Sequence, residues 1–457
     1  MKWRKALFNE AISIMFDYTI SIENILYGFL LLPFIYLLIR YPEITFALFI
    51  SAGAYKGDPR LSFLPELLDL TVMFGSLSLI GVILKIMVKK TRFIIPPKKI
   101  LIPYLIIVLI GTISLSYTIA PIYGMNKLLR FLTITSLSLY LPLFIFQEIK
   151  PFKSFFLIII ALSFLMVLDI ISGGVKPGEF KTYEVFGSDY LTTGEIIGFA
   201  IIIVSFYFFT NTHNKYIKFI YLSLPPFLIW GLLIIAGRGP IIALAFSTLS
   251  IPICLGILTL TIKSSSMFLA HIKANLKLLI PVFILVSFGT VVAIIFSEHF
   301  RTTFYRFSLA KDLSTTGRIE LFKKAIIAIF SFPEFITGLG IGGFSVFYEG
   351  IDYQRGAYPH NIFLEIGSEF GIFGLISIVL LIIWSLYFSI SSIKKAQSEE
   401  SSLSITLFAL LVYTVVNASK SGDINHNRIL FMSIGLIYAF GNIIINKRHS
   451  LCVSYER

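Results

Sequence analysis

Residues 154–172 read SFFLIIIALSFLMVLDIIS, with a single charged side chain, Asp169, near the end of the stretch. A helix that crosses a bilayer needs about 20 mostly apolar residues. Similar stretches recur along the 457-residue chain, which is 56% hydrophobic and 14% charged and has a mean hydropathy of +0.88. This composition predicts an all-α protein that crosses a membrane many times. It disfavours soluble proteins that bind nucleotides, metals or nucleic acids.

The apolar stretches predict about twelve transmembrane helices. They cover residues 22–40, 66–84, 100–118, 128–147, 154–172, 192–210, 216–236, 240–262, 276–296, 371–392, 402–418 and 428–446. A shorter apolar segment, 43–55, is bounded by Pro42 and Lys56. This segment either enters the membrane without crossing it or shares one crossing with residues 22–40.

Basic residues lie mainly between the apolar stretches. The chain carries 38 Lys and Arg against 25 Asp and Glu, a net charge of +13. The loop 85–99 has no acidic residue and contains Lys85, Lys89, Lys90, Arg92, Lys98 and Lys99. Such loops accumulate on the cytoplasmic side, and counting spans from this one places residues 297–359 outside. We interpret the net charge as membrane topology, with an anionic lipid-linked substrate as a second contributor.

Three regions follow from this count. Residues 1–296 form transmembrane helices with short loops, residues 297–359 form one long external loop, and residues 360–457 form the C-terminal transmembrane helices. The long loop contains an amphipathic helix from Arg318 onward, whose apolar face is predicted from Ile319, Phe322, Ile326 and Ile329, opposite Glu320, Lys323 and Lys324. A helix of this kind can lie in the membrane interface.

Two arginines are candidate anion-binding residues. Arg238 lies in the hairpin 236–240 between two apolar stretches, where a guanidinium is rare and suits a phosphate group. The alternative is a side chain that only reaches the interface. Arg318 follows Ser314-Thr315-Thr316-Gly317 at the start of the amphipathic helix, and free amides there favour anions. The alternative is ordinary capping of that helix.

A histidine motif and a polar loop supply the other candidates. His360 lies in Tyr358-Pro359-His360-Asn361 and titrates near neutrality, so it can accept a proton from a hydroxyl group. Glu365 and Glu369 share one helix face and either hold that imidazole, contact the acceptor or line an aqueous rim. The loop 421–428 contains Asp423 and Arg428, which either meet there or belong to a solvated hairpin.

These motifs, in this order, resemble the bacterial O-antigen polymerase and O-antigen ligase family of polytopic glycosyltransferases. The resemblance covers residues 230–445 and is most specific in His360-Asn361, followed by Gly371 and Gly374. It extends to Arg238-Gly239-Pro240, Gly317-Arg318, Gly422-Asp423 and Asn427-Arg428. Ile242 departs from the ligases, which often have Leu at this place. The surroundings of His360 look more like those of polymerases.

The resemblance implies an enzyme that takes a glycan from undecaprenyl diphosphate on the external face of the bacterial inner membrane. A polymerase joins the glycan to another lipid-linked repeat, whereas a ligase joins it to lipid A-core. The family needs no metal, nucleotide sugar or other cofactor, binds no nucleic acid, and can work with a chain-length regulator in the lipid bilayer. His360, Arg238 and Arg318 would be catalytic, and the substrate-binding residues would be Asn361, Arg355, Glu365, Glu369, Asp423 and Arg428.

A transporter or flippase for lipid-linked sugars is the competing class. In that case the arginines would line a passive path for the anion. Many transporters are built from two repeated halves with broken helices in corresponding positions, and the sequence has no such halves. A transporter also gives no reason for a long external loop that leads into His360-Asn361.

Overall fold

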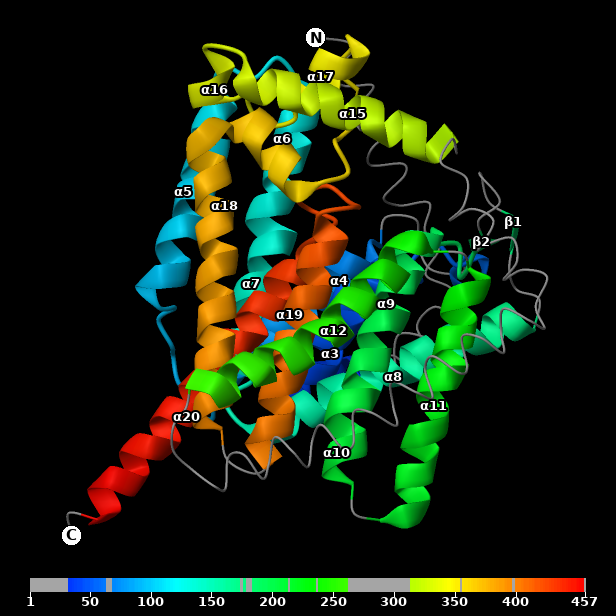
Figure 1. The fold of residues 1–457 in the computed structure, drawn as a ribbon, viewed down its shortest axis with the longest axis vertical. Coiled ribbons are helices and arrows are strands. Elements are labelled where there is room, and N and C mark those ends of the chain that lie inside the picture. Colours follow the sequence, from blue (N-terminus) through cyan, green and yellow to red (C-terminus); the bar gives the residue numbers. More distant parts are fainter. Residues whose placement is uncertain are drawn as a thin grey trace.

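The computed structural model describes residues 32–62, 68–172, 176–177, 183–212, 214–235, 237–261, 313–353, 356–396 and 399–455. These residues form a bundle of helices, to which the two-residue strands β1 (Lys176–Pro177) and β2 (Tyr183–Glu184) add one antiparallel pair (Figure 1). Nine of the described helices are long and apolar enough to cross a membrane, or up to ten with one bent pair. The protein is therefore a helical, polytopic membrane protein.

The number of twelve spans stays a prediction. The expected span 276–296 lies outside the described residues, and the expected span 100–118 is the 17-residue helix α5. The first part of the chain contains α3 (Pro42–Ser51), η1 (Ala52–Ala54), η2 (Pro59–Leu61), α4 (Leu70–Met87), α5 (Lys98–Ser114), α6 (Pro121–Arg130), the π-helical η3 (Phe131–Thr135), α7 (Ser136–Ile145) and α8 (Ile149–Ile171).

The helices of the second part begin after the short strands. They are α9 (Tyr190–Ile203), the π-helical η5 (Val204–Phe208), α10 (Phe209–Asn211), α11 (Lys215–Ile234), α12 (Arg238–Thr261), α15 (Leu313–Phe330), α16 (Glu334–Thr337), α17 (Gly343–Glu349), α18 (Ile362–Lys395), α19 (Glu399–Ala418) and α20 (Arg428–Tyr455).

The segment 43–55 forms its own helix rather than continuing the preceding one. Leu32–Arg40 and Pro42–Ala54 are bent by 99° relative to each other. Tyr41 between them has non-helical backbone angles, φ −117° and ψ 70°. Proline at the first position of α3 ends the preceding helix, because its ring excludes the residue before it from the helical conformation. The two segments therefore do not form one straight crossing.

Three of the spans form the centre of the bundle. The span Tyr190–Asn211 is 94% buried inside the protein, and those of α19 and α20 are each 78% buried, whereas the other six are 33–50% buried. Glycines bring the central helices close together. A Cβ on Gly198 of α9 would lie 2.2 Å from the hydroxyl oxygen of Tyr413 on α19, and one on Gly435 of α20 would lie 2.3 Å from the carbonyl oxygen of Leu139 on α7. Small residues at such positions are typical of membrane helix packing.

Helix α18 is broken at Gly371, and a glycine-rich loop fills the break. Gly371 has a left-handed backbone with φ +65° and ψ −165°, so the helical hydrogen-bond ladder is interrupted there. The carbonyls of Ser368 and Glu369 accept instead from the amides of Leu339 (2.9 Å) and Gly340 (3.0 Å). The run Gly338–Gly343 is thus part of the scaffold that supports the start of α18.

We expect Gly371→Ala to destabilise the protein. The new Cβ would lie 2.3 Å from the carbonyl oxygen of Ile336, and the left-handed backbone alone disfavours alanine by about 1 kcal/mol or more. Scanning fluorimetry of the detergent-purified variant should give a lower melting temperature. Gly256→Ala on α12 is the matched control, because nothing lies within 4 Å of its added Cβ. Equal melting temperatures for both variants would contradict this account of the break.

Candidate active site

Helices α15, α16 and α17 lie across one end of the bundle, which we call the α15 end (Figure 1). The C-terminal part of α20 lies at the opposite end. Helix α15 packs on α18, and its buried residues are Ala325, Ala328 and Ile329. Ile319 and Ile326 of the predicted apolar face are 47% and 45% exposed, whereas Ile329 of that face is buried. The apolar face is therefore turned partly toward α18 and partly to the outside of the protein.

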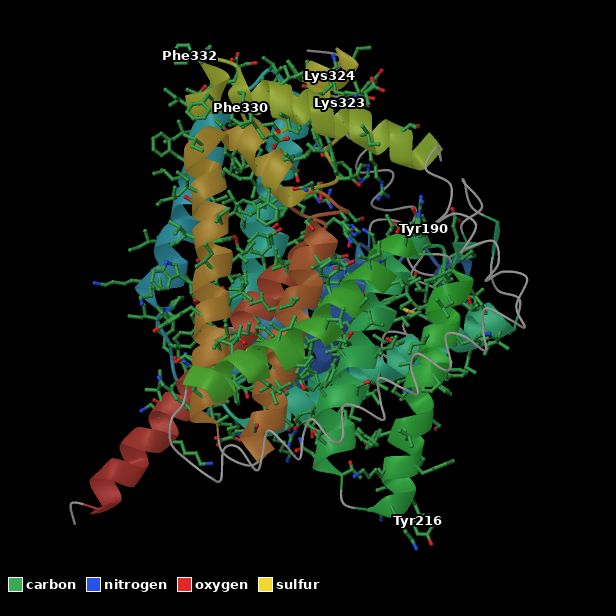
Figure 2. All side chains as sticks on the ribbon, viewed as in Figure 1. Tyr190, Tyr216, Lys323, Lys324, Phe330 and Phe332 are labelled. Atoms are coloured by element: carbon green, nitrogen blue, oxygen red, sulfur yellow. The ribbon has the colours of Figure 1, made fainter. Side chains whose placement is uncertain are left out.

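The outer side of α15 combines basic and aromatic side chains. Lys323 and Lys324 are exposed, and Phe330 and Phe332 at the C-terminal end of the helix are 74% and 80% exposed (Figure 2). Exposed aromatic rings beside lysines are typical of a helix that lies in a membrane interface. The arrangement agrees with the interfacial helix predicted for this segment.

The chain after α16 is bound to the start of α6. Thr118 donates its hydroxyl to the carbonyl of Ile341 (2.8 Å). The carboxylate of Asp352 accepts from the backbone amides of Ile122 (2.8 Å) and Tyr123 (3.2 Å). Asp352 thereby caps α6 from a distant part of the sequence. These bonds place α6 directly under the α15 end.

A buried ion cluster joins α6 to α18. Nζ of Lys127 lies 2.5 Å from Oε1 of Glu365, and 2.7 and 2.8 Å from the two carboxylate oxygens of Glu369. The three side chains are at most 2% exposed. Two of the alternatives from the sequence were that Glu365 and Glu369 hold the imidazole of His360 or line an aqueous rim. Both are wrong, because the two carboxylates are buried against Lys127. One lysine, which the motif reasoning did not consider, binds both.

Backbone groups extend this cluster to two loops. The amide of Gly342 donates to the carboxylate of Glu369. The side-chain amide of Asn425 donates to the carbonyl of Lys127 (3.0 Å), and its oxygen accepts from the hydroxyl of Thr135 (3.1 Å). The cluster therefore connects the glycine-rich loop, α6 and the loop before α20.

His360 lies just before α18 in an unusual backbone conformation. Its φ is +53°, a left-handed geometry that costs most residues about 1 kcal/mol or more. Its ring centroid lies 4.3 Å from that of Tyr358, and Pro359 between them is buried. Nδ1 of His360 is buried and has no hydrogen-bond partner within the described part of the chain. The imidazole is thus held at the α15 end with one polar atom unused.

The surroundings of His360 keep its imidazole neutral. Burial, and then the positive charges of Arg318 and of His426 when protonated, lower the pKa of His360 to about 4, while the carboxylate of Asp423 acts in the opposite direction. Burial, together with the carboxylates of Asp423 and Glu365, raises the pKa of Tyr358 above its usual value. At neutral pH the site therefore presents a neutral imidazole and a protonated phenol next to a guanidinium.

Arg318 and Asn361 connect this site to the loop before α20. Nη1 of Arg318 donates to the carbonyl of Lys420 (3.2 Å). The side-chain oxygen of Asn361 caps α18 by accepting from the amides of Phe363 (2.9 Å) and Leu364 (3.1 Å), and its Nδ2 donates to the carbonyl of Ser419 (2.9 Å). Both the oxygen and the nitrogen of the Asn361 side chain are therefore engaged in structural hydrogen bonds.

Asp423 and Arg428 do not meet, although the sequence left that possibility open. The Asp423 side chain accepts from the amide of His426 (2.6 Å) and acts on His360. The guanidinium of Arg428 lies 5.8 Å from the ring centroid of Phe49, and its Nη2 lies 2.9 Å from the place of a Cβ on Gly53. The structure thus brings together Arg318, His360 and Asp423, whereas Arg428 lies near Gly53 and its charge acts on Glu195 of α9.

Arg238 begins α12 and is half-buried. Pro240, two residues later, lines a pocket together with His426, whose charge acts on His360. Arg238 is therefore close to the same loop as Arg318, on the side of α9 and α12. Arg355 lies outside the described residues.

No protein-family model and no curated protein matches this chain.

Motif reasoning passed over two buried charged residues. The predicted span 128–147 leaves out Lys127, whereas α6 already begins at Pro121. A proline at the first helical position is a signal that could have corrected this boundary. Glu195 is the single acid in the apolar helix α9 and is 6% exposed. A charge inside a span is by itself a reason to suspect a functional group.

We expect Lys127→Met to destabilise the protein strongly, because it leaves two carboxylates buried without their cation. Removing one partner of a buried ion pair lowers the free energy of unfolding by about 3–5 kcal/mol. The melting temperature in detergent should fall, and the triple variant Lys127→Met, Glu365→Gln, Glu369→Gln should recover much of the loss by removing all three charges. If Lys127→Met alone melts like the wild type, the ion cluster does not stabilise the α15 end.

Proposed function

We propose that the protein is a glycosyltransferase that polymerises undecaprenyl-diphosphate-linked oligosaccharide repeats. The observation that carries this proposal is the neutral, buried imidazole of His360, which Arg318 and Asp423 face from two other segments. A group that accepts a proton lies beside a group that binds an anion. This combination suits a reaction in which a hydroxyl group attacks and a diphosphate leaves.

The reaction follows from these roles. The hydroxyl oxygen of the acceptor sugar attacks C1 of the donor sugar, and a new carbon–oxygen bond forms as the bond from C1 to the phosphate oxygen breaks. The hydroxyl proton moves to the imidazole of His360, and the electron pair of the broken bond leaves with the diphosphate. Direct attack inverts the configuration at C1. Arg318 and Arg238 stabilise the charge that grows on the diphosphate oxygens.

The bound diphosphate also prepares the base. Positive charge at Arg318 is one cause of the low pKa of His360. A diphosphate next to Arg318 offsets that charge, so it raises the pKa of His360 in the complex and makes the imidazole a better proton acceptor. The base therefore becomes stronger when the donor is in place.

The charge distribution supports an external site in the bacterial inner membrane. Lys89, Lys90 and Arg92 connect α4 to α5, at the opposite end of α5 from Thr118, which is bound to the α15 end. Basic loops favour the cytoplasm, so the α15 end faces outward. Lipid-linked donor, acceptor glycan and a chain-length regulator would meet the protein there.

Deleting the gene in its bacterium tests the proposal. A polymerase deletion should leave surface glycans of a single repeat, seen on a gel of lipopolysaccharide or capsule, and the plasmid-borne gene should restore long chains. An O-antigen ligase, which would use the same residues on a lipid A-core acceptor, would instead leave long chains on the carrier. Unchanged glycans in the deletion strain would contradict both.

We expect His360→Ala to lower the transfer rate about 10²–10⁴-fold, with little change in binding of the lipid-linked donor, because the arginines bind the diphosphate. His360 must be neutral to accept a proton, so kcat/KM of the wild type should be lost as pH falls through about 4. This lies below the ordinary histidine value of about 6.5. The measurement is initial transfer rate against pH in purified protein, beside donor affinity for the variant.

A histidine that only supports the start of α18 gives a different result. In that case His360→Ala would lower protein yield and donor binding together with the rate. Asn425→Ala serves as a comparison, because it removes a structural bond to Lys127 and leaves the imidazole in place. An acid limb near pH 6.5 in kcat/KM would contradict the low pKa of His360.

A further inference from the structure

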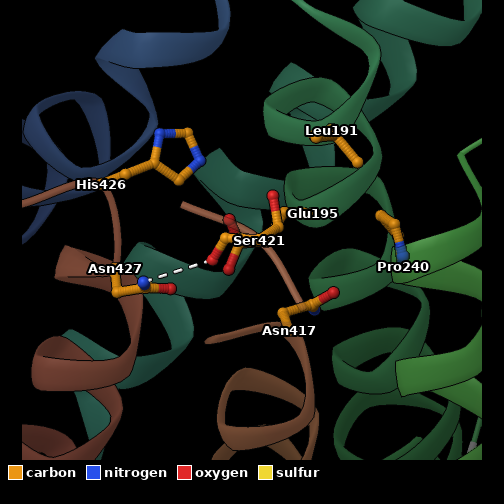
Figure 3. A pocket seen from close by; sticks show the side chains of 7 residues that line it. All are labelled: Leu191, Glu195, Pro240, Asn417, Ser421, His426 and Asn427. Carbon is orange, nitrogen blue, oxygen red and sulfur yellow. Dashed lines mark hydrogen bonds between the residues drawn. The ribbon is translucent and has the colours of Figure 1, made fainter. Parts of the chain in front are cut away.

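A small pocket lies beside the proposed catalytic group, between α9, α12, α19 and the loop before α20. Its lining residues are Leu191, Glu195, Pro240, Asn417, Ser421, His426 and Asn427 (Figure 3). The cavity has a volume of about 10 Å³, which is room for one water molecule or one hydroxyl group. The reaction described above uses none of its polar side chains.

The side chain of Glu195 is the acidic group of this pocket. It is 6% exposed on α9, the most buried span. Figure 3 shows it next to Ser421. The hydroxyl of Tyr413 contacts the backbone carbonyl of Glu195 (3.1 Å) and so holds this turn of α9. An acidic group at such depth is costly and usually faces a partner or a cavity, and here it lines the cavity while the charge of Arg428 acts on it.

The other polar side chains supply both donors and acceptors. Asn417 is 4% exposed, and its Nδ2 is buried without a hydrogen bond of normal geometry in the described structure. Nδ2 of Asn427 is already bonded to the carbonyls of Ser421 (3.3 Å) and Asp423 (2.9 Å). An acceptor at Glu195 and a donor at Asn417, whose side chain also faces the hydroxyl of Tyr413, are therefore offered to a ligand.

This pattern selects a neutral hydroxyl group. A hydroxyl donates one hydrogen bond and accepts others, so it satisfies a carboxylate and an amide at the same time. A fully ionised phosphate has only acceptor oxygens, so it cannot donate a hydrogen bond to Glu195 while it accepts one from Asn417. The pocket thus complements the arginine sites, which attract the anion.

We infer that this pocket binds a hydroxyl group of the acceptor sugar, with Glu195 accepting its hydrogen bond and Asn417 donating one. The inference rests on the proposed function. His426 lines the pocket and is also one of the groups whose charge acts on His360, so the pocket and the base are neighbours. A sugar anchored there by one hydroxyl presents another hydroxyl to His360, which makes Glu195 and Asn417 determinants of acceptor specificity.

Protection from alkylation tests the ligand class. Ser421→Cys, in a background with Cys254→Ser and Cys452→Ser, places a thiol at the pocket. The lipid-linked repeat extracted from the deletion strain should slow its reaction with N-ethylmaleimide at least severalfold, whereas undecaprenyl diphosphate should not. Ser116→Cys, an exposed position at the α15 end, should react at the same rate with or without either lipid. Equal protection by both lipids, or protection by neither, would overturn the inference.

Kinetics give a second readout. Glu195→Ala should raise the concentration of lipid-linked single repeat needed for half-maximal rate by about tenfold, the size of one lost hydrogen bond. Affinity for lipid-linked polymer as donor should change much less. Glu400→Gln is the matched control, because Glu400 is also buried but binds Lys447 (2.6 Å).

The two proposals fail in different ways. If the wild type forms no polymer from these lipids, the proposed function is wrong. If the wild type polymerises them and Glu195→Ala shows the same acceptor dependence as the wild type, the pocket is not the acceptor site, and the proposed function stands.

Discussion

One ammonium group between two carboxylates holds the α15 end together. Lys127 comes from α6, and Glu365 and Glu369 come from α18. The backbone of the glycine-rich loop and the side chain of Asn425 bond to the same cluster. Four segments of the chain therefore converge on one buried charge, and the position of each depends on the others. Hydrophobic packing alone would allow these helices to slide, because lipid is as apolar as their side chains.

The cluster lies directly below the candidate catalytic group. Glu365 is in the first turns of α18, and Asn361 caps that helix while also bonding to the loop before α20. His360 precedes the cap in a left-handed conformation, so its imidazole is oriented by rigid neighbours on both sides. A group on such a support needs little rearrangement when a substrate arrives, which is the condition for efficient proton transfer.

Apolar length and basic loops were sufficient to predict a polytopic helical protein, because a bilayer imposes the same requirement on every span. The sequence motifs also singled out His360, Arg318 and Asp423, and the structure brings these three side chains together. The partner of Glu365 and Glu369 was missed, because Lys127 lies 242 residues from Glu369 and no local pattern connects them. The position of the Arg428 guanidinium could not be predicted either, because it depends on the space that Gly53 leaves without a Cβ. Both are consequences of tertiary packing, which spacing along one sequence does not encode.

The capping of α6 has a consequence for biosynthesis. Asp352 caps α6, although the amides that it caps lie about 230 residues earlier in the sequence. Lys127 of the same helix lies 242 residues before its partner Glu369. A lysine without a partner is costly in the hydrocarbon region but tolerated near the interface. Until α18 has been synthesised, Lys127 lacks the two carboxylates that it binds in the folded protein. The last quarter of the chain therefore completes the charge balance of a helix that is made much earlier.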